Sequence, residues 1–155
     1  MNERQFEELN EHLQRVMPCM DRFCEIAGYE YVNRRALGRY PRIRIQQPGE
    51  ICRWIELWME LDENGDRYER FFEDIPYELS AGAKVEITDG TPYGHRYFKT
   101  FVLFSRKPFR EVPLALEAQL RKAHVLLSGW DKAFVMAQGR KVVLGGAPGS
   151  NVSQF

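Results

Sequence analysis

The stretch ICRWIELWMEL (51–61), DENGD (62–66) and RYERFFEDIPY (67–77) decides the fold. In its first part, aliphatic residues such as Ile55 and Leu57 alternate with tryptophan and glutamate, a spacing that favours a strand with two different faces. A helix would also align part of this run, but the alternation makes a strand over residues 50–61 the better prediction. The acids and Gly65 then suit a hairpin loop, and RYERFF suits the returning strand.

The N-terminal segment predicts the clearest helix. Apolar residues recur at steps of three and four over residues 2–27, which is typical of an amphipathic helix packed on a core. Pro18 lies inside this pattern and removes a backbone donor, so we expect a kink or two abutting helices. Gly28 follows where a left-handed residue would end the helix.

The rest of the chain predicts an antiparallel sheet and a second helix. We expect strands near residues 29–37 and 42–47, a break at Pro76 and residues 80–82, a short strand at 84–88 and a long, central strand at 97–105. A helix at about 112–127 has Pro113 in its first turn. AFVMA–QGR–KVVL (133–144) reads as a C-terminal hairpin, and 145–155 as a flexible tail rich in Gly and Ser.

Together these elements predict an α+β fold in a single domain, residues 1–144. It has a kinked N-terminal helix, a twisted antiparallel sheet of five to seven strands, a second helix on one face and a C-terminal hairpin. A chain of 155 residues fits one domain that needs no disulfide or metal to fold. No secretory signal or apolar run of about 20 residues is visible, so the default expectation is a cytoplasmic protein without a membrane partner.

The sequence offers no specific catalytic or metal motif. The three cysteines lack metal-ligand spacing, and the usual nucleophile, phosphate-loop and zinc-protease patterns are missing, so we expect no cofactor. Asp62, Asn64, Asp66 and Glu73 have the spacing of a calcium loop, but Arg67 stands where such a loop needs glycine. An enzyme is left open, with the balance against it.

Charge is distributed unevenly along a chain whose 22 basic and 22 acidic residues cancel. Residues 53–78 contain nine acids and three arginines, and the flanking segments 31–49 and 91–110 contain basic residues and no acid. Two explanations stay open. Basic strands beside an acidic one would form cross-strand ion pairs, or the acids and tryptophans would stay exposed for a partner.

The leading functional hypothesis is a small non-enzymatic protein-binding domain, such as an immunity-type inhibitor, that engages a basic protein partner through an acidic hairpin face. Its tryptophans would serve as binding hot spots, and its acids would steer the partner. The alternative is a small-ligand or hydrolase-type site that uses His95 with a carboxylate. Third comes weak nucleic-acid binding through Arg34–Arg44, against which the zero net charge argues. The proposed binding residues are Trp54, Glu56, Trp58, Glu60, Asp62, Asp66, Glu69 and Glu73; the sequence does not indicate an oligomeric state.

Overall fold

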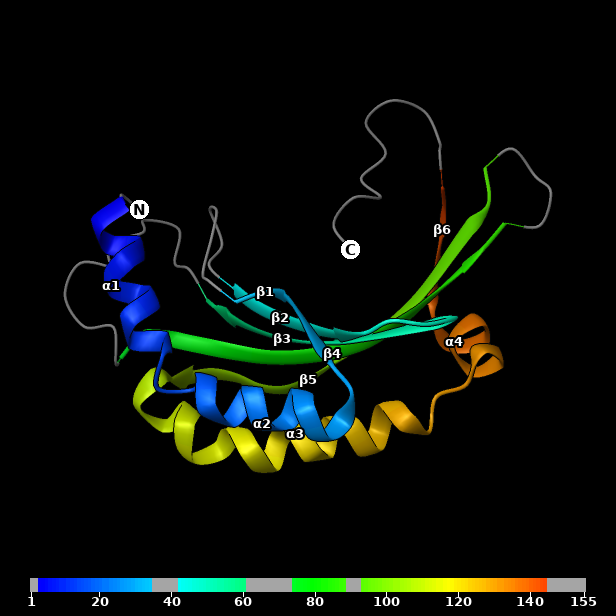
Figure 1. The fold of residues 1–155 in the computed structure, drawn as a ribbon. Helices are drawn as coiled ribbons and strands as arrows, with labels where there is room; N and C mark the ends of the chain where they lie inside the picture. Colours follow the sequence, from blue (N-terminus) through cyan, green and yellow to red (C-terminus); the bar gives the residue numbers. More distant parts are fainter. Residues whose placement is uncertain (1–2, 35–41, 61–73, 89–92, 145–155) are drawn as a thin grey trace.

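The computed structural model describes residues 3–34, 42–60, 74–88 and 93–144 (Figure 1). Within them, four helices and an antiparallel sheet of six strands form the predicted α+β fold, and the strands lie side by side in chain order. The helices are α1 (Glu3–Leu13), α2 (Met17–Ala27), α3 (Val112–Ser128) and α4 (Lys132–Gln138). The strands are β1 (Glu30–Asn33), β2 (Arg42–Gln47), β3 (Ile51–Met59), β4 (Pro76–Ile87), β5 (His95–Pro108) and β6 (Arg140–Val143).

The N-terminal helical segment divides into two helices, one of the two outcomes that Pro18 predicts. α1 ends at Leu13, and α2 starts at Met17 with the proline in its first turn, where the missing N–H costs nothing. Gly28 ends α2 in the left-handed conformation, with φ of 76°, and its N–H bonds to the Cys24 carbonyl. The helix boundaries are therefore set by proline and glycine as the sequence indicates.

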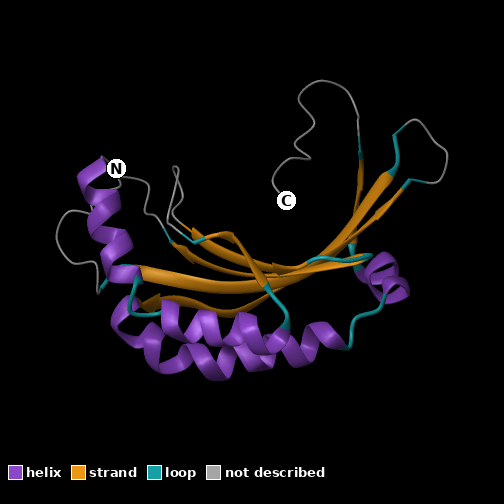
Figure 2. Cartoon of the chain, viewed as in Figure 1, coloured by secondary structure: helices purple, strands orange, loops and turns teal. Residues whose placement is uncertain are grey.

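The stretch around Trp54 is a strand, as the alternation predicts. β3 is the third of six strands; it pairs with β4 along its whole length and with β2 over Arg53–Trp58. Ile55, Leu57 and Met59 are at most 1% exposed and belong to the hydrophobic core, which also receives Leu116 and Leu120 from α3. In Figure 2 the two helices α2 and α3, labelled in Figure 1, lie beneath the sheet on the side of this core.

The predicted break in the next segment is wrong: β4 runs without interruption from Pro76 to Ile87. Pro76 is tolerated because it starts the strand, and its carbonyl accepts the Glu60 N–H at 2.9 Å. Glycine is needed at position 82 inside the strand, because a Cβ there would lie 2.5 Å from the Trp54 ring. The small residues at 80–82 thus mark a close approach between neighbouring strands.

The predicted C-terminal hairpin is also wrong. Residues 133–137 belong to α4, and Asp131 is the N-cap of this helix: its carboxylate accepts the Phe134 N–H at 2.7 Å. The five-residue run AFVMA was too short for its period to distinguish a strand from a helix. Only the second arm is a strand, β6, and it pairs with β5 over His95–Phe98. Beyond Phe98, β5 pairs only with β4 among the described residues, so it is central only where it begins.

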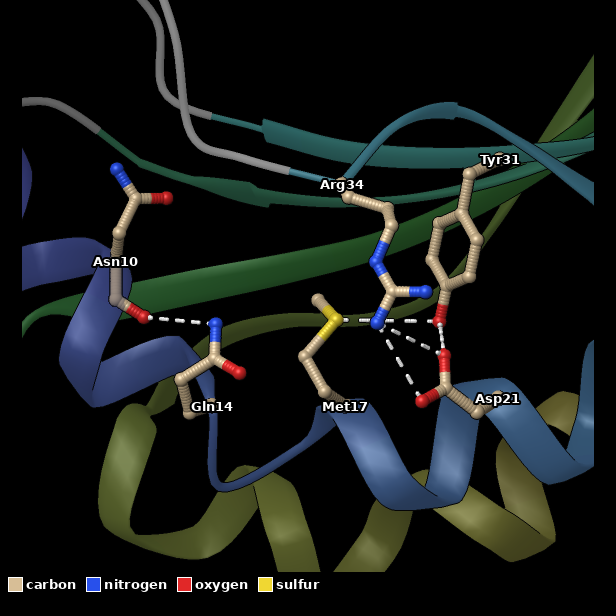
Figure 3. A network of polar contacts seen from close by, with 6 residues as sticks. All are labelled: Asn10, Gln14, Met17, Asp21, Tyr31 and Arg34. Carbon is tan, nitrogen blue, oxygen red and sulfur yellow. Dashed lines mark hydrogen bonds and ion pairs between the residues drawn. The ribbon is translucent and has the colours of Figure 1, made fainter.

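Polar contacts hold α2 against the edge of the sheet (Figure 3). The Tyr31 hydroxyl of β1 donates to Asp21 of α2 at 2.6 Å, and Arg34 lies 3.4 Å from the same carboxylate. The Arg34 guanidinium also stacks 4.6 Å from the centre of the Tyr31 ring. Burial, together with the bond to Asp21, raises the pKa of the Tyr31 hydroxyl. These contacts orient the first strand on the helix layer.

Candidate functional site

The sheet has two chemically different faces. The pairing of β2, β3 and β4 sends Ile45, Ile55 and Ala81 to the face on which α2 and α3 pack, called here the helix-packed face. Alternate residues go to the opposite side, which no described helix covers (Figure 1). This polar face carries Arg42, Arg44 and Gln46 from β2, Cys52, Trp54, Glu56 and Trp58 from β3, and Glu78, Ser80, Gly82 and Lys84 from β4.

Trp54 is buried at the centre of the polar face. Its side chain is 2% exposed, although no described helix lies over it. The ring rests on Gly82, its direct neighbour in β4, and the Arg44 guanidinium lies 4.9 Å from the ring centre. Trp54 is thus held between a glycine and an arginine, in a cation–π contact typical of Arg and Trp.

Arg44 and Glu56 form a largely buried ion pair beside Trp54. Their nearest nitrogen and oxygen atoms are 3.4 Å apart, and the side chains are only 7% and 14% exposed. Arg42 lies 3.8 Å from the same carboxylate. Burial lowers the pKa of the Arg44 guanidinium, and the charge of Glu56 opposes this shift. Glu56 is therefore neutralised inside the fold, as the cross-strand explanation of the charge pattern expects.

The acids nearer the end of β3 are placed differently. Glu60 accepts a hydrogen bond from Ser105 at 2.9 Å, and Glu78 lies directly opposite Trp58. Within the described residues, neither carboxylate has an ion pair. Burial raises the pKa of Glu78; the Trp58 indole N–H opposes this shift, while the charges of Glu60 and Glu56 add to it. These residues, Trp58, Glu60 and Glu78, are called the acidic end of the polar face.

Half of the proposed binding residues can be located. Trp54, Glu56, Trp58 and Glu60 share the polar face, but only Trp58 and Glu60 combine partial exposure with no internal ion pair in the part of the chain that is described. The predicted hairpin-tip residues Asp62, Asp66, Glu69 and Glu73 lie outside the described residues, as do Asn64 and Arg67 of the calcium-like spacing. Among the residues that are described, no group of three or more metal-ligating side chains occurs.

Glu78 is the site residue that sequence reasoning missed. Its partner Trp58 could have been found by pairing β3 with a continuous β4, since the two positions face each other in the register. The predicted break at Pro76 and residues 80–82 hid that register. The sequence signal that could have indicated Glu78 is its position two residues after Pro76, because a proline that begins a strand places this glutamate inside the strand.

His95 stands apart from the polar face. It begins β5, pairs with Ile87 and Val143, and is half-buried. No hydrogen bond or ion pair joins His95 to a carboxylate of the described residues, so the geometry required of a general base is not found there.

The arginines proposed to bind nucleic acid are engaged internally. Arg34 contacts Asp21 and Tyr31, while Arg42 and Arg44 contact Glu56. Arg35 and Arg39 lie outside the described residues. The described arginines thus act as counter-charges of the fold and do not form a continuous basic surface.

Comparisons with known proteins identify no relative of this chain. Neither protein-family models, nor curated proteins, nor solved structures give a significant match to the chain. In the described part of the chain, every helix is too short or too polar to cross a membrane.

Proposed function

We propose that this protein is a protein-binding domain that takes a basic segment of a partner against the acidic end of its polar face. The observation that supports the proposal is the pair Glu60 and Glu78, which lie beside a half-buried tryptophan and have no ion pair within the described residues. Two other acids of this face are already paired: Glu56 has two arginines, and Glu86 has Arg96 and Lys84.

A cation from a partner would complete this arrangement. The pKa of Glu78 is raised by burial and by neighbouring negative charges, so an incoming Lys or Arg would offset repulsion that the fold leaves in place. Trp58 offers the partner an aromatic surface, and tryptophan is enriched at the energetic centres of interfaces. Charge complementarity of this kind mainly raises the association rate and the specificity.

An immunity-type inhibitor, which covers a basic toxin surface with acids, is one class of protein that this arrangement suits. In such a complex, the buried pair of Arg44 and Glu56 would stiffen the centre of the face, and the acidic end would make the contacts. The two groups of acids would therefore have different tasks, one structural and one in recognition.

The test compares the proteins captured by the wild type with those captured by the double variant Glu60→Lys/Glu78→Lys. A matched control, Glu3→Lys/Glu11→Lys, makes the same charge change on α1. We expect the first variant to lose the basic partners and the control to keep them. With a captured partner in hand, surface plasmon resonance should show association slowed by about tenfold or more and a weaker salt dependence. Circular dichroism verifies that each variant folds.

Capture of the same basic proteins by the wild type and by the Glu60→Lys/Glu78→Lys variant would overturn the proposal. Equal losses in both double variants would do so as well, because the effect would then report net charge and not this face.

A further inference from the structure

A groove lies between α2 and α3 on the helix layer, on the opposite side of the molecule from the polar face. Its volume is about 290 Å³. Phe23 and Ala27 of α2 and Leu120 of α3 form much of its apolar wall, and Ile26 and Val125 stand on its rim, 85% and 72% exposed. Pockets for small ligands usually hold ~300–1,000 Å³, and this groove lies at the lower limit of that range, so only a small ligand would fit it.

Charge at the groove is concentrated in one arginine. Arg22 of α2 lines it, is exposed to solvent, and makes no ion pair or hydrogen bond within the described residues. Arg121, across the groove on α3, is bonded to Glu117 one turn earlier. The lining therefore carries one excess positive charge, and that charge sits beside an apolar wall.

The lining of the groove contains a buried polar atom that has no partner among the described residues. His124 lines it and contacts Phe23 and Tyr29 edge-on, with ring centres 6.0 Å apart in both cases. The His124 Nδ1 atom is buried and has no hydrogen-bond partner within the described residues. Burial of a polar atom without a partner is costly, and a bound group that supplies a hydrogen bond is one way in which the cost is relieved.

We propose that this groove binds a small amphiphile with an apolar tail and a carboxylate head, of the class of medium-chain fatty acids. The tail would cover the apolar wall formed by Phe23, Ala27 and Leu120. The carboxylate would accept hydrogen bonds from Arg22, whose planar guanidinium matches two carboxylate oxygens. This inference is independent of the proposed partner, because it concerns another face of the molecule and other residues.

The first test titrates the whole protein with sodium octanoate and with 1-octanol by isothermal titration calorimetry. Octanoate should bind more tightly than the alcohol, which has the same tail length and no charge. Arg22→Met should weaken octanoate binding by roughly tenfold or more, since hydrogen bonds to charged groups are strong, and it should leave octanol unaffected. Arg22→Lys should retain most of the preference for the anion. Lys122→Met removes an exposed charge on α3 beside the groove and serves as the control.

The second test uses Cys19, which lines the same groove. Its pKa is raised by burial, so its alkylation by iodoacetamide should be slow at neutral pH and easy to follow by peptide mass mapping. Octanoate should slow the labelling of Cys19 severalfold and should not change that of Cys52, which lies on the polar face. Cys52 thus provides an internal control in the same sample.

Equal affinity for octanoate and octanol would overturn the proposal, as would unchanged octanoate binding in a folded Arg22→Met variant. The absence of octanoate binding, or equal protection of Cys19 and Cys52, would also overturn it and would leave the groove as a seat for an apolar side chain of another protein.

Discussion

The helix-packed face of the sheet and the centre of its polar face reach similar burial by different means. Ile55 and Leu57 are buried under helices that supply matching apolar residues. Trp54 and Arg44 on the other face are almost as inaccessible, at 2% and 6% exposure, but through a stack that ends on Gly82. Alternation along a strand therefore predicts which face a residue joins, and does not predict whether that face is buried.

The polar face itself has two parts. Around Trp54, each charged side chain has an internal counter-charge. Around Trp58, two carboxylates have none within the described residues. A difference of this kind within one face is expected where the first part maintains the fold and the second is available for recognition, because internally paired charges contribute little to attracting a partner.

The largest expected effect contrasts a residue of each face. Leu57→Ala removes a side chain that is 1% exposed, between Ile43 and Leu79, and should lower the free energy of unfolding by about 3 kcal/mol. Val102→Ala truncates a side chain of the polar face that is 55% exposed and should cost less than about 0.5 kcal/mol. Urea denaturation measures both. Similar losses would mean that the two faces are packed alike.

The second effect probes the support beneath Trp54. A Cβ at position 82 would lie 2.5 Å both from the Trp54 ring and from the Lys99 carbonyl oxygen, so Gly82→Ala should cost about 2 kcal/mol. In a Trp54→Leu background the cost should be smaller, because one of the two close contacts is removed. A double-mutant cycle by urea denaturation measures the coupling. Equal cost in both backgrounds would show that the carbonyl contact alone requires glycine.

Gly82 also shows where prediction from sequence stopped. The strand at residues 51–59 and the division of the N-terminal helix near Pro18 both follow from local backbone geometry, so both could be predicted. Small residues at 80–82 have two meanings, a turn or a close approach. Only the position of the Trp54 ring on the neighbouring strand distinguishes them. Information of this kind lies in contacts between strands that are far apart in sequence.

The candidate site divides in the same way. The alternation placed Trp54, Glu56 and Trp58 on one face correctly. The alternation could not show that Glu56 is neutralised and Glu60 is not. That difference depends on the register of β2, which brings Arg44 opposite Glu56, and alternation within one strand does not reveal the register of its neighbour. Glu78 belongs to the site because the register of β4 places it opposite Trp58. In the C-terminal segment, the short apolar run AFVMA was compatible with a strand or a helix. The N-cap at Asp131 stabilises the helix.

The third effect separates the two arginines that share Glu56. Arg44→Met removes a buried charge that also covers Trp54, and should cost about 2 kcal/mol of unfolding free energy because Glu56 loses its nearer partner. Arg42→Met removes a side chain that is 47% exposed and should cost less than about 0.5 kcal/mol. Chemical denaturation of both variants provides the comparison. If the order were reversed, Arg42 would be the structural counter-charge.

The smallest effect concerns Glu78 and depends on pH. Its pKa in the folded protein lies above the ordinary value of 4.5, so the folded state binds the proton more tightly than the unfolded state does. The ionised form therefore lowers stability as pH rises through the raised pKa, and the penalty vanishes below about pH 4.5. Since the side chain is partly exposed, solvent screens the charge, and Glu78→Gln should raise the melting temperature at pH 7 by only about 1 °C.

At pH 4 the variant Glu78→Gln and the wild type should melt together, because the protonated acid and the amide then have the same charge. Differential scanning calorimetry at the two pH values measures the difference. A variant that melts lower than the wild type at pH 7 would mean that the bond from the Trp58 indole outweighs burial and repulsion. Glu78 would then belong with Glu56 as a satisfied acid of the fold, and Glu60 alone would be left to attract a basic partner.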